Sequence, residues 1–233
     1  MNPYIRFRDI IKLIILEFSD RLDEAETIAL GTGRTSEVIM DVLHDLGLLR
    51  GKVLTATSYD TLLKLNSIGY NVTSPLSLKT IDIYIDSADF VDRKGNMIKG
   101  GGGALTMEKI LAFHSKLRIF IVDEGKVTNI CPNKPIPVEV LPNALNLVKH
   151  YLERQGFKVI LRECNCKRGP AISDVGGIII DVVPPRKACE NMERLEYILE
   201  TIPGIVMCGI FTKKLIDFIY VFNEKSYYVL KEY

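Results

Sequence analysis

The sequence has almost no net charge and few histidines, the side chains that most often bind zinc. Its 30 Lys and Arg residues balance 29 Asp and Glu residues, which leaves a formal net charge of +1. No overall field therefore favours nucleic acid or an anionic membrane surface. The three histidines are scattered and no Cys-x-x-Cys pair occurs, so we expect no metal site. An anionic ligand would have to bind at a local site.

Long apolar runs are also lacking. The longest fall far short of the roughly 18 residues that a membrane span needs. Charged residues at Arg6, Arg8 and Asp9 interrupt what would be the apolar core of a signal peptide. We therefore expect a soluble, cytoplasmic protein with no membrane partner.

Five cysteines occur, at positions 131, 164, 166, 189 and 208. Their odd number and the missing Cys-x-x-Cys pair predict reduced thiols in a cytosolic protein. Cys164 and Cys166 are two residues apart, a spacing that would place both on one face of a strand. The sequence assigns no function to any of them.

The first half of the chain alternates between strand and helix patterns. Strands are predicted at 24–30, 52–56, 71–73, 81–85 and 117–122, and helical periodicity occurs in 10–18, 38–43, 61–65 and 105–115. Such alternation predicts an α/β fold with a doubly wound, mostly parallel, Rossmann-like sheet. The 233 residues suffice for one large or two modest domains.

The composition changes at 131–137, which contains three prolines and is predicted to be a linker. Beyond it, strands are predicted at 138–141, 158–163, 177–182 and 205–211, and helices at 144–155 and 189–201. This order predicts a smaller α+β domain with an antiparallel sheet. The expected division is 1–130 with 205–233 as one domain and 131–204 as the other. A last strand is predicted at 218–222.

Gly31-Thr32-Gly33-Arg34-Thr35 lies between a predicted strand and a predicted helix. Backbone N–H groups at the start of a helix can bind a phosphate-sized anion, and the hydroxyls can assist. A plain tight turn is the alternative. A dinucleotide site is excluded because Ser36 takes the place of the third glycine and no acidic residue ends the strand at 52–56.

Ser58 follows the second strand directly, where it could either cap the next helix or contact a ligand. Asp86 and Asp89 follow the strand at 81–85 in the same way. Ligands of doubly wound sheets bind beyond the carboxyl ends of the strands. The three turns are therefore expected to meet at one crevice.

The stretch 86–109 carries more reactive groups than a fold requires. Asp86 and Asp89 are followed by Lys99, by the four glycines 100–103, and by Glu108 in a helical pattern. Each glycine costs about 0.5–1 kcal/mol in backbone entropy relative to alanine. A run of four favours a loop whose N–H groups approach a ligand, although a glycine-rich connection is the simpler alternative.

This stretch resembles the type A family of ribose-5-phosphate isomerases, in which Asp-Gly-Ala-Asp-Glu is followed by Lys-Gly-Gly-Gly and a helical Glu. Asp86, Asp89, Lys99 and Glu108 fall on the family's catalytic positions, whereas Ser87 replaces Gly and Phe90 replaces Glu. The loop 31–35 is similar to the family's Gly-Thr-Gly-Ser-Thr phosphate loop, with Arg34 in place of Ser. The resemblance covers roughly residues 28–212.

The resemblance also implies the remaining site residues. Lys126 matches a lysine that reaches the substrate phosphate, and Pro137-Val-Glu-Val140 and the partly matching 173–181 belong to a lid-like domain. The residues expected to bind substrate are Gly31, Thr32, Gly33, Arg34, Thr35, Ser58, Gly100, Gly101, Gly102 and Lys126. A solvated turn lysine is the alternative for Lys126. A homodimer or homotetramer is expected.

The implied reaction interconverts ribose 5-phosphate and ribulose 5-phosphate through an enediolate, as in the non-oxidative pentose phosphate pathway. Glu108 would carry the proton, Lys99 would neutralise the oxyanion, and Asp86 and Asp89 would assist ring opening. No cofactor is required. The alternative is a sugar-phosphate sensor of the same fold, but too few residues precede the phosphate loop for a winged helix, and a sensor has no use for Lys99 with Glu108.

Overall fold

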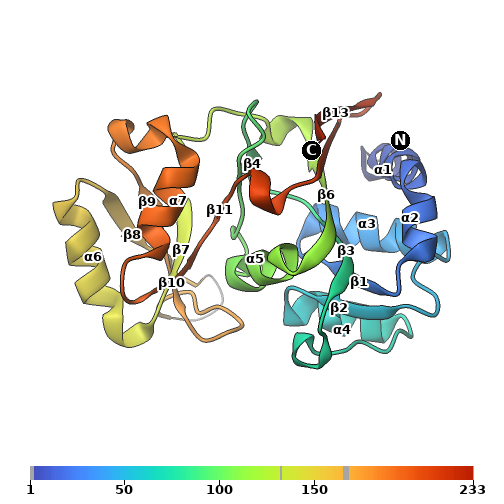
Figure 1. The fold of residues 1–233 in the computed structure, drawn as a ribbon, viewed down its shortest axis with the longest axis horizontal. Helices are drawn as coiled ribbons and strands as arrows, with labels where there is room; N and C mark the ends of the chain where they lie inside the picture. Colours follow the sequence, from blue (N-terminus) through green and yellow to red (C-terminus); the bar gives the residue numbers. More distant parts are fainter. Residues whose placement is uncertain (1–2, 132, 165–167, 233) are drawn as a thin grey trace. The chain divides into compact units, whose positions relative to one another are not determined.

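The computed structural model describes residues 3–131, 133–164 and 168–232. The chain forms two compact units. Unit 1 comprises residues 1–88, 110–126 and 213–233, and unit 2 comprises residues 89–109 and 127–212. Figure 1 shows their helices and strands, coloured along the sequence. Helix α5 (Leu105–Phe113) passes from unit 2 into unit 1.

Unit 1 is built on a six-stranded sheet in the order β13-β12-β6-β3-β1-β2. The strands are β1 (Thr27–Leu30), β2 (Val53–Ala56), β3 (Ile81–Asp86), β6 (Ser115–Asp123), β12 (Phe218–Phe222) and β13 (Tyr227–Glu232). All neighbouring pairs are parallel except β12 with β13. The chain turns from β2 back across β1 to β3, which creates a switch point between β1 and β3. The predicted doubly wound, mostly parallel sheet is confirmed.

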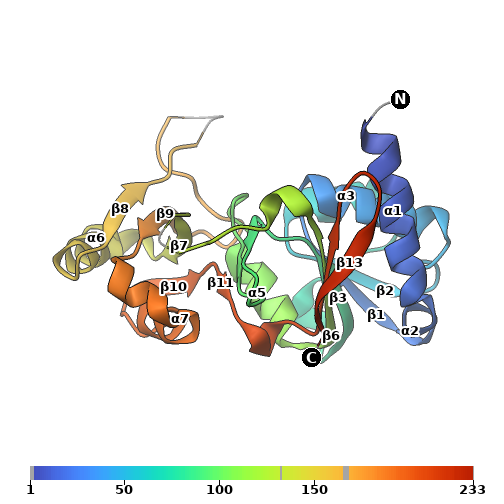
Figure 2. The same ribbon diagram turned by 90° about the horizontal axis from the view of Figure 1, so that it is seen from above.

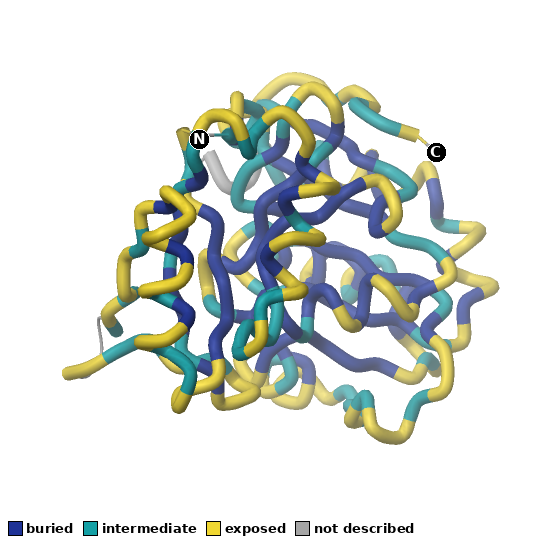
Figure 3. Tube along the Cα trace, turned by 60° about the vertical axis from the view of Figure 1, so that its left-hand side comes forward, coloured by how far each residue is buried: buried dark blue, intermediate teal, exposed yellow. Residues whose placement is uncertain are grey.

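Helices cover this sheet because their apolar residues recur at helical spacing. They are α1 (Pro3–Glu17), α2 (Ser19–Glu24), α3 (Arg34–Asp45) and α4 (Tyr59–Ser67), with the short 3₁₀ segments η1 (Pro75–Ser77), η2 (Glu124–Lys126) and η5 (Lys213–Leu215). Figure 2 shows α1 beside α3. Ile14 and Ile15 of α1 join Ile39 and Leu43 of α3 in one apolar cluster with the strands. Buried positions follow the strands in Figure 3, whereas exposed positions follow turns and outer helix faces.

One predicted strand of this region is wrong. Residues 71–73 contribute only an isolated bridge between Val72 and Leu54. The segment continues into the 3₁₀ segment η1, whose Pro75 lacks the N–H group that a ladder requires. The strand β13 was not predicted, although it completes an antiparallel hairpin with the predicted strand at 218–222.

Unit 2 contains a four-stranded antiparallel sheet in the order β10-β7-β9-β8, as predicted for the smaller region. Its strands are β7 (Ile136–Val140), β8 (Lys158–Leu161), β9 (Ile178–Val183) and β10 (Ile205–Cys208), and its helices are α6 (Leu145–Arg154) and α7 (Met192–Glu200) with η3 (Pro142–Ala144) and η4 (Arg186–Glu190). A three-stranded sheet joins β11 (Ile210–Phe211), β5 (Met97–Ile98) and β4 (Phe90–Val91). The apolar core of unit 2 contains Val138, Val148, Ile180 and Leu195 together with neighbouring residues.

The boundary between the units differs from the predicted division. Residues 89–109, 127–130 and 205–212 group with unit 2 rather than with the parallel sheet. The reason is strand pairing, because β5 pairs with β11 and Lys99 donates its backbone N–H to Gly209 over 2.8 Å. The glycine-rich stretch is thus built into the same unit as the antiparallel sheet.

The prediction that all thiols are reduced is also wrong. Cys131 and Cys189 form a disulfide whose Cα atoms lie 5.5 Å apart. The residues are 58 positions apart in the sequence, so only tertiary packing brings them together. Cys208 is buried as a free thiol and Cys164 is half-buried, whereas Cys166 lies outside the described residues. Among the helices in the described part of the chain, none combines the length and the apolarity of a membrane span.

Candidate active site

The loop between β1 and α3 lies against the end of β3. Gly31 donates its N–H to the carbonyl of Ile85 over 2.9 Å. A Cβ atom on Gly31 would lie 1.7 Å from Oδ1 of Asp86, so a larger residue cannot occupy this position. Gly33 has a φ of 101°, which L side chains rarely adopt, and α3 begins at the next residue. Gly31 is therefore required by the close approach of Asp86, and Gly33 by its backbone conformation.

Asp86 is completely buried and holds this loop in place. Its carboxylate accepts hydrogen bonds from the hydroxyl of Ser36 at 2.8 Å, from the backbone N–H of Ser87 at 2.7 Å and from the hydroxyl of Tyr84. Buried carboxylates need such donors, because an unpaired buried charge is costly. Tyr84 was not found from the sequence, since a tyrosine inside a buried strand gives no functional signal. Ser36, which takes the place of the third glycine of a dinucleotide pattern, instead donates its hydroxyl to Asp86.

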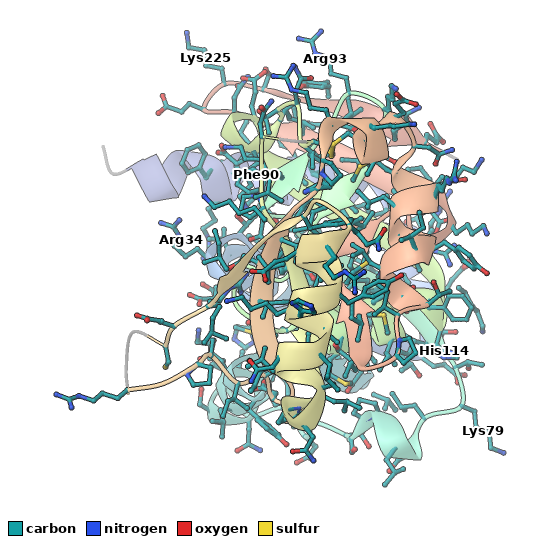
Figure 4. All side chains as sticks on the ribbon, turned by 90° about the vertical axis from the view of Figure 1, so that its left-hand side faces the viewer. Arg34, Lys79, Phe90, Arg93, His114 and Lys225 are labelled. Atoms are coloured by element: carbon teal, nitrogen blue, oxygen red, sulfur yellow. A yellow bond between two sulfur atoms is a disulfide. The ribbon has the colours of Figure 1, made fainter. Side chains whose placement is uncertain are left out.

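Ser58 combines the two roles that the sequence left open. Its side chain accepts a hydrogen bond from the N–H of Thr61 at 3.2 Å and so caps α4. The same hydroxyl donates to Thr32 in the glycine loop at 3.0 Å, and Thr61 donates to the carbonyl of Gly31 at 3.0 Å. The turn at Ser58 therefore stabilises the glycine loop 31–35. Thr32 and Thr35 are half-buried, while Arg34 is exposed (Figure 4).

Lys126 joins the same edge of the sheet. It ends η2, which follows β6 directly, and its ammonium lies 3.3 Å from the hydroxyl of Ser87. Asp123 accepts the N–H of Gly125 at 2.8 Å and shapes this turn. In unit 1 the loop 31–35, Ser58 and Asp86 therefore lie at the carboxyl ends of β1, β2 and β3, as the sequence predicted for a parallel sheet. Lys126 lies at the carboxyl end of the neighbouring strand β6.

In unit 2, Lys99 and Glu108 form a buried ion pair. The Lys99 ammonium lies 3.2 Å from Oε1 of Glu108, and the side chains are 3% and 5% exposed. Lys99 also lies over the ring of Phe211, with 5.8 Å from its ammonium to the ring centroid. Glu108 is in the first turn of α5, where the helix dipole favours a negative charge. The two groups meet because the four glycines reverse the chain between β5 and α5.

Asp89 braces the glycine turn itself. Its carboxylate accepts the N–H of Gly101 at 2.6 Å, and a Cβ atom on Gly101 would approach Asp89 Oδ1 to 2.6 Å. Gly100, with a φ of 100°, has no room for a side chain because its Cβ would lie 2.7 Å from that of Leu105. Gly101 and Gly102 are exposed. Gly100 is thus required by close approach and by backbone conformation, and Gly101 by close approach to Asp89.

Two further buried clusters hold α5 at its first turn. Glu139 on β7 is completely buried and accepts hydrogen bonds from the hydroxyls of Thr106 and Ser173 and from the N–H of Gly177 at 3.0 Å. The sequence pattern had marked Glu139 only as part of Pro137-Val-Glu-Val140. Because Thr106 lies in the first turn of α5, the Glu139 carboxylate fixes the start of the helix that carries Glu108.

The second cluster surrounds Lys109. Its ammonium lies 2.7 Å from a carboxylate oxygen of Glu196 and 2.7 Å from one of Glu200, both on α7. Burial opposes its charge, but the two carboxylates outweigh burial and raise the pKa of Lys109. Burial raises the pKa of the neighbouring Cys208 thiol to about 12, so this thiol is protonated at neutral pH. No group of three or more His, Cys, Asp or Glu side chains within the described ranges is arranged to hold a metal ion.

Comparison with known proteins gives consistent matches. The profile of the family described as ribose 5-phosphate isomerase A (phosphoriboisomerase A) matches residues 53–226. A relative from Aeropyrum pernix named ribose-5-phosphate isomerase A is 37% identical over 213 residues, which cover 90% of this chain and 88% of the relative. A protein of the same name from Bordetella parapertussis is 40% identical over 185 residues, covering 79% and 77% of the two chains.

Solved structures agree with these matches. A D-ribose-5-phosphate isomerase in complex with phospho-erythronic acid superimposes with a TM-score of 0.86 at 32% identity, covering 97% of this chain and 98% of the other. The ribose 5-phosphate isomerase A of Methanocaldococcus jannaschii gives a TM-score of 0.84 at 30% identity, covering 96% and 99%.

Proposed function

The chain belongs to the ribose 5-phosphate isomerase A family, and we propose that it interconverts ribose 5-phosphate and ribulose 5-phosphate. The observation that carries this proposal is the buried pair of Lys99 and Glu108, 3.2 Å apart, of which Lys99 directly precedes the glycine turn and Glu108 lies in the helix that follows it. An aldose–ketose isomerase needs a base beside a fixed positive charge. This pair supplies both in one unit of the protein.

In the proposed reaction Glu108 removes the proton from C2 of the open-chain aldose. The C–H electron pair forms the C1=C2 double bond, and the carbonyl electrons move to O1, which gives an enediolate. The Lys99 ammonium stabilises the developing charge, because electrostatic stabilisation is strongest at a buried, preorganised site. Glu108 then returns its proton to C1 while a proton passes from O2 to O1, which leaves the ketone at C2.

The phosphate is assigned to unit 1. The backbone N–H groups of 32–35 at the start of α3, the hydroxyls of Thr32 and Thr35, and the Lys126 ammonium suit a dianion. The exposed Arg34 guanidinium can add a further charge-assisted contact. Binding energy from this non-reacting group would orient the sugar.

The two aspartates receive different roles. Asp89 is half-buried, and we assign it to the ring-opening step, in which a proton leaves the C1 hydroxyl and one reaches the ring oxygen. Asp86 accepts hydrogen bonds from Ser36, Tyr84 and Ser87, so we assign it first to holding the phosphate loop. Gly100, Gly101 and Gly102 are assigned to substrate binding through their backbone groups.

The decisive experiment incubates the purified protein with ribose 5-phosphate and, separately, with ribulose 5-phosphate, and follows both sugars by NMR. An isomerase should bring both solutions to the same mixture. In D₂O the product should carry deuterium, because a carboxylate that shuttles the proton can exchange it with solvent. Saturable binding without any conversion would instead identify a sugar-phosphate sensor.

We further propose that the protein acts in the cytoplasm, within the non-oxidative pentose phosphate pathway, as a homodimer or homotetramer. A phosphorylated sugar carries charge and is retained inside cells, which supports the location. The disulfide between Cys131 and Cys189 is uncommon for a cytosolic protein. Cell fractionation tests the location, and light scattering on the purified protein tests the oligomer; a monomeric mass would contradict the assembly.

A further inference from the structure

Arg162 contacts the glycine turn from a distant part of the sequence. It follows β8, and its guanidinium binds Asp181 of β9 through two bonds, from Nε to Oδ2 at 2.9 Å and from Nη2 to Oδ1 at 2.5 Å. The two side chains are 19% and 18% exposed. The remaining terminal nitrogen, Nη1, donates to the carbonyl oxygens of Gly100 at 2.7 Å and Gly101 at 3.0 Å. Arg162 thus joins the antiparallel sheet to the glycine turn.

These contacts fix the orientation of two successive peptide planes. In a trans peptide the carbonyl of one residue and the N–H of the next point in opposite directions. With both carbonyls directed at Arg162, the N–H groups of Gly101 and Gly102 point to the other side. The N–H of Gly101 indeed donates to Asp89 at 2.6 Å. The guanidinium and the Asp89 carboxylate therefore hold one peptide from its two ends.

A glycine turn needs such a restraint more than other loops do. Glycine loses more backbone entropy on ordering than any other residue, and four successive glycines have no side chains to pack. Arginine suits this position because its planar, permanently charged fork can bind a carboxylate and two carbonyls together. Lysine cannot reproduce that geometry. Asp181 also balances the charge of Arg162, which limits the field it adds near Lys99 and Glu108.

We propose that Arg162, oriented by Asp181, is a positioning residue that fixes the glycine turn between Lys99 and Glu108. The inference rests on the proposed function and names residues on which its rate depends. Gly100 follows Lys99 directly and Gly103 leads into the helix of Glu108. If the peptide planes of the turn could reorient, the distance between the Lys99 ammonium and the Glu108 carboxylate would vary. Small displacements of reacting groups can lower rates by about a hundredfold.

The chain offers a matched control in Arg118. Its guanidinium also binds an aspartate through two bonds, from Nε to Oδ2 of Asp217 at 2.7 Å and from Nη2 to Oδ1 at 2.8 Å. Its side chain is 18% exposed and that of Asp217 is 20% exposed. Arg118 also donates to the carbonyl of Ser115, at 3.1 Å. It therefore resembles Arg162 in burial and bonding, but its contacts lie in unit 1 and none is with the glycine turn.

The experiment compares Arg162→Lys with Arg118→Lys in the full chain. We expect Arg162→Lys to lower kcat at least tenfold with less than a threefold change in KM, because the lost restraint acts on the transition state. Arg118→Lys should keep kcat within twofold of the parent value, although we expect it to lower the thermal midpoint about as much as Arg162→Lys does. Hydrogen exchange followed by mass spectrometry should show faster exchange in residues 99–104 only for Arg162→Lys.

Each outcome decides the proposal. Equal kcat losses in the two variants, or an unchanged kcat in Arg162→Lys, would overturn it. If Arg162→Lys does not fold, Asp181→Asn replaces it, since this change keeps the side-chain shape but removes the charge that orients Arg162; the same kcat and exchange criteria apply. If the parent protein does not isomerise ribose 5-phosphate, the proposed function fails, and exchange in residues 99–104 alone decides whether Arg162 holds the turn.

Discussion

The ammonium of Lys99 lies 3.2 Å from a carboxylate oxygen of Glu108, with both side chains almost completely buried. A buried ion pair contributes little to stability compared with an apolar pair of the same volume, because both charges are desolvated. Its presence at the end of a glycine turn is therefore better explained by chemistry than by folding.

Glu108→Gln should lower kcat by about 10² to 10⁴, the usual effect of losing a general base. The amide has the shape of the carboxylate and can still accept a hydrogen bond from Lys99, so the fold should persist. Activity, the thermal midpoint and the affinity for phospho-erythronic acid are to be measured together. A fall in kcat of less than tenfold would show that Glu108 is not the base, and a collapsed midpoint would show a structural role.

Unphosphorylated ribose should be isomerised at least about a hundredfold less efficiently than ribose 5-phosphate, which corresponds to about 2.7 kcal/mol in the transition state. The reason is that the loop 31–35 and Lys126 would have no group to bind. The quantity to compare is kcat/KM for the two sugars. Lys126→Met should lower kcat/KM for the phosphorylated sugar but not for ribose; similar values for the two sugars in the parent protein would remove the phosphate site from the mechanism.

Treatment with EDTA should leave the activity unchanged. In the proposed mechanism the Lys99 ammonium provides the positive charge that a metal ion provides in other isomerases. The initial rate is measured before and after prolonged dialysis against the chelator. Loss of activity that Mg²⁺ or Zn²⁺ restores would contradict the assigned role of Lys99.

Asp82→Asn should destabilise the protein at neutral pH but not in acid. The Lys116 ammonium and the backbone N–H groups of Thr27 and Glu26 lower the pKa of Asp82 below 3.8. A lowered pKa contributes stability above pH 3.8 that is lost as the pH falls through the folded-state value. The difference in thermal midpoint between parent and variant should therefore shrink as the pH falls from 5 toward 2.

The control for this prediction is Lys116→Met. This change removes the Lys116 ammonium, whose side chain is 68% exposed. The backbone N–H groups of Glu26 and Thr27 still donate to the Asp82 carboxylate. Exposed ion pairs contribute little, so its effect at neutral pH should be the smaller one. A difference between Asp82→Asn and the parent that does not vary with pH would contradict the assignment to the charge of Asp82.

Cys131→Ser should destabilise unit 2. Closing a loop between residues 58 apart lowers the entropy of the unfolded chain by an amount worth about 4 kcal/mol. Denaturant unfolding of parent and variant measures the loss, and peptide mapping without reductant should recover a cross-linked pair containing Cys131 and Cys189. Cys208→Ser serves as the control that removes a buried thiol without opening a disulfide. Two free thiols at positions 131 and 189 in the native protein would contradict the structure.

Local features of the sequence predicted most of the parallel sheet and the residues at its edge. Gly31, Ser58 and Asp86 each follow a buried apolar run directly, and parallel strands place such residues at one edge. Asp89, Lys99 and Glu108 lie within 20 residues of one another in the sequence, and the four glycines 100–103 lie between Lys99 and Glu108. Motifs of this kind can be found from sequence because the chain connects their members over short distances.

The tertiary structure decided the contacts between distant residues. Arg162 reaches the carbonyl of Gly100 from 62 positions away, and Cys131 pairs with Cys189 from 58 positions away. The replacement of the predicted strand at 71–73 by a single bridge also depends on which neighbours are available. No periodicity or spacing marks these relationships, because they arise when separate strands pack against each other and bring a guanidinium, a carboxylate or a thiol to its partner. The sequence by itself thus determined the reactive groups and the order of the elements, whereas packing determined what holds those groups in place.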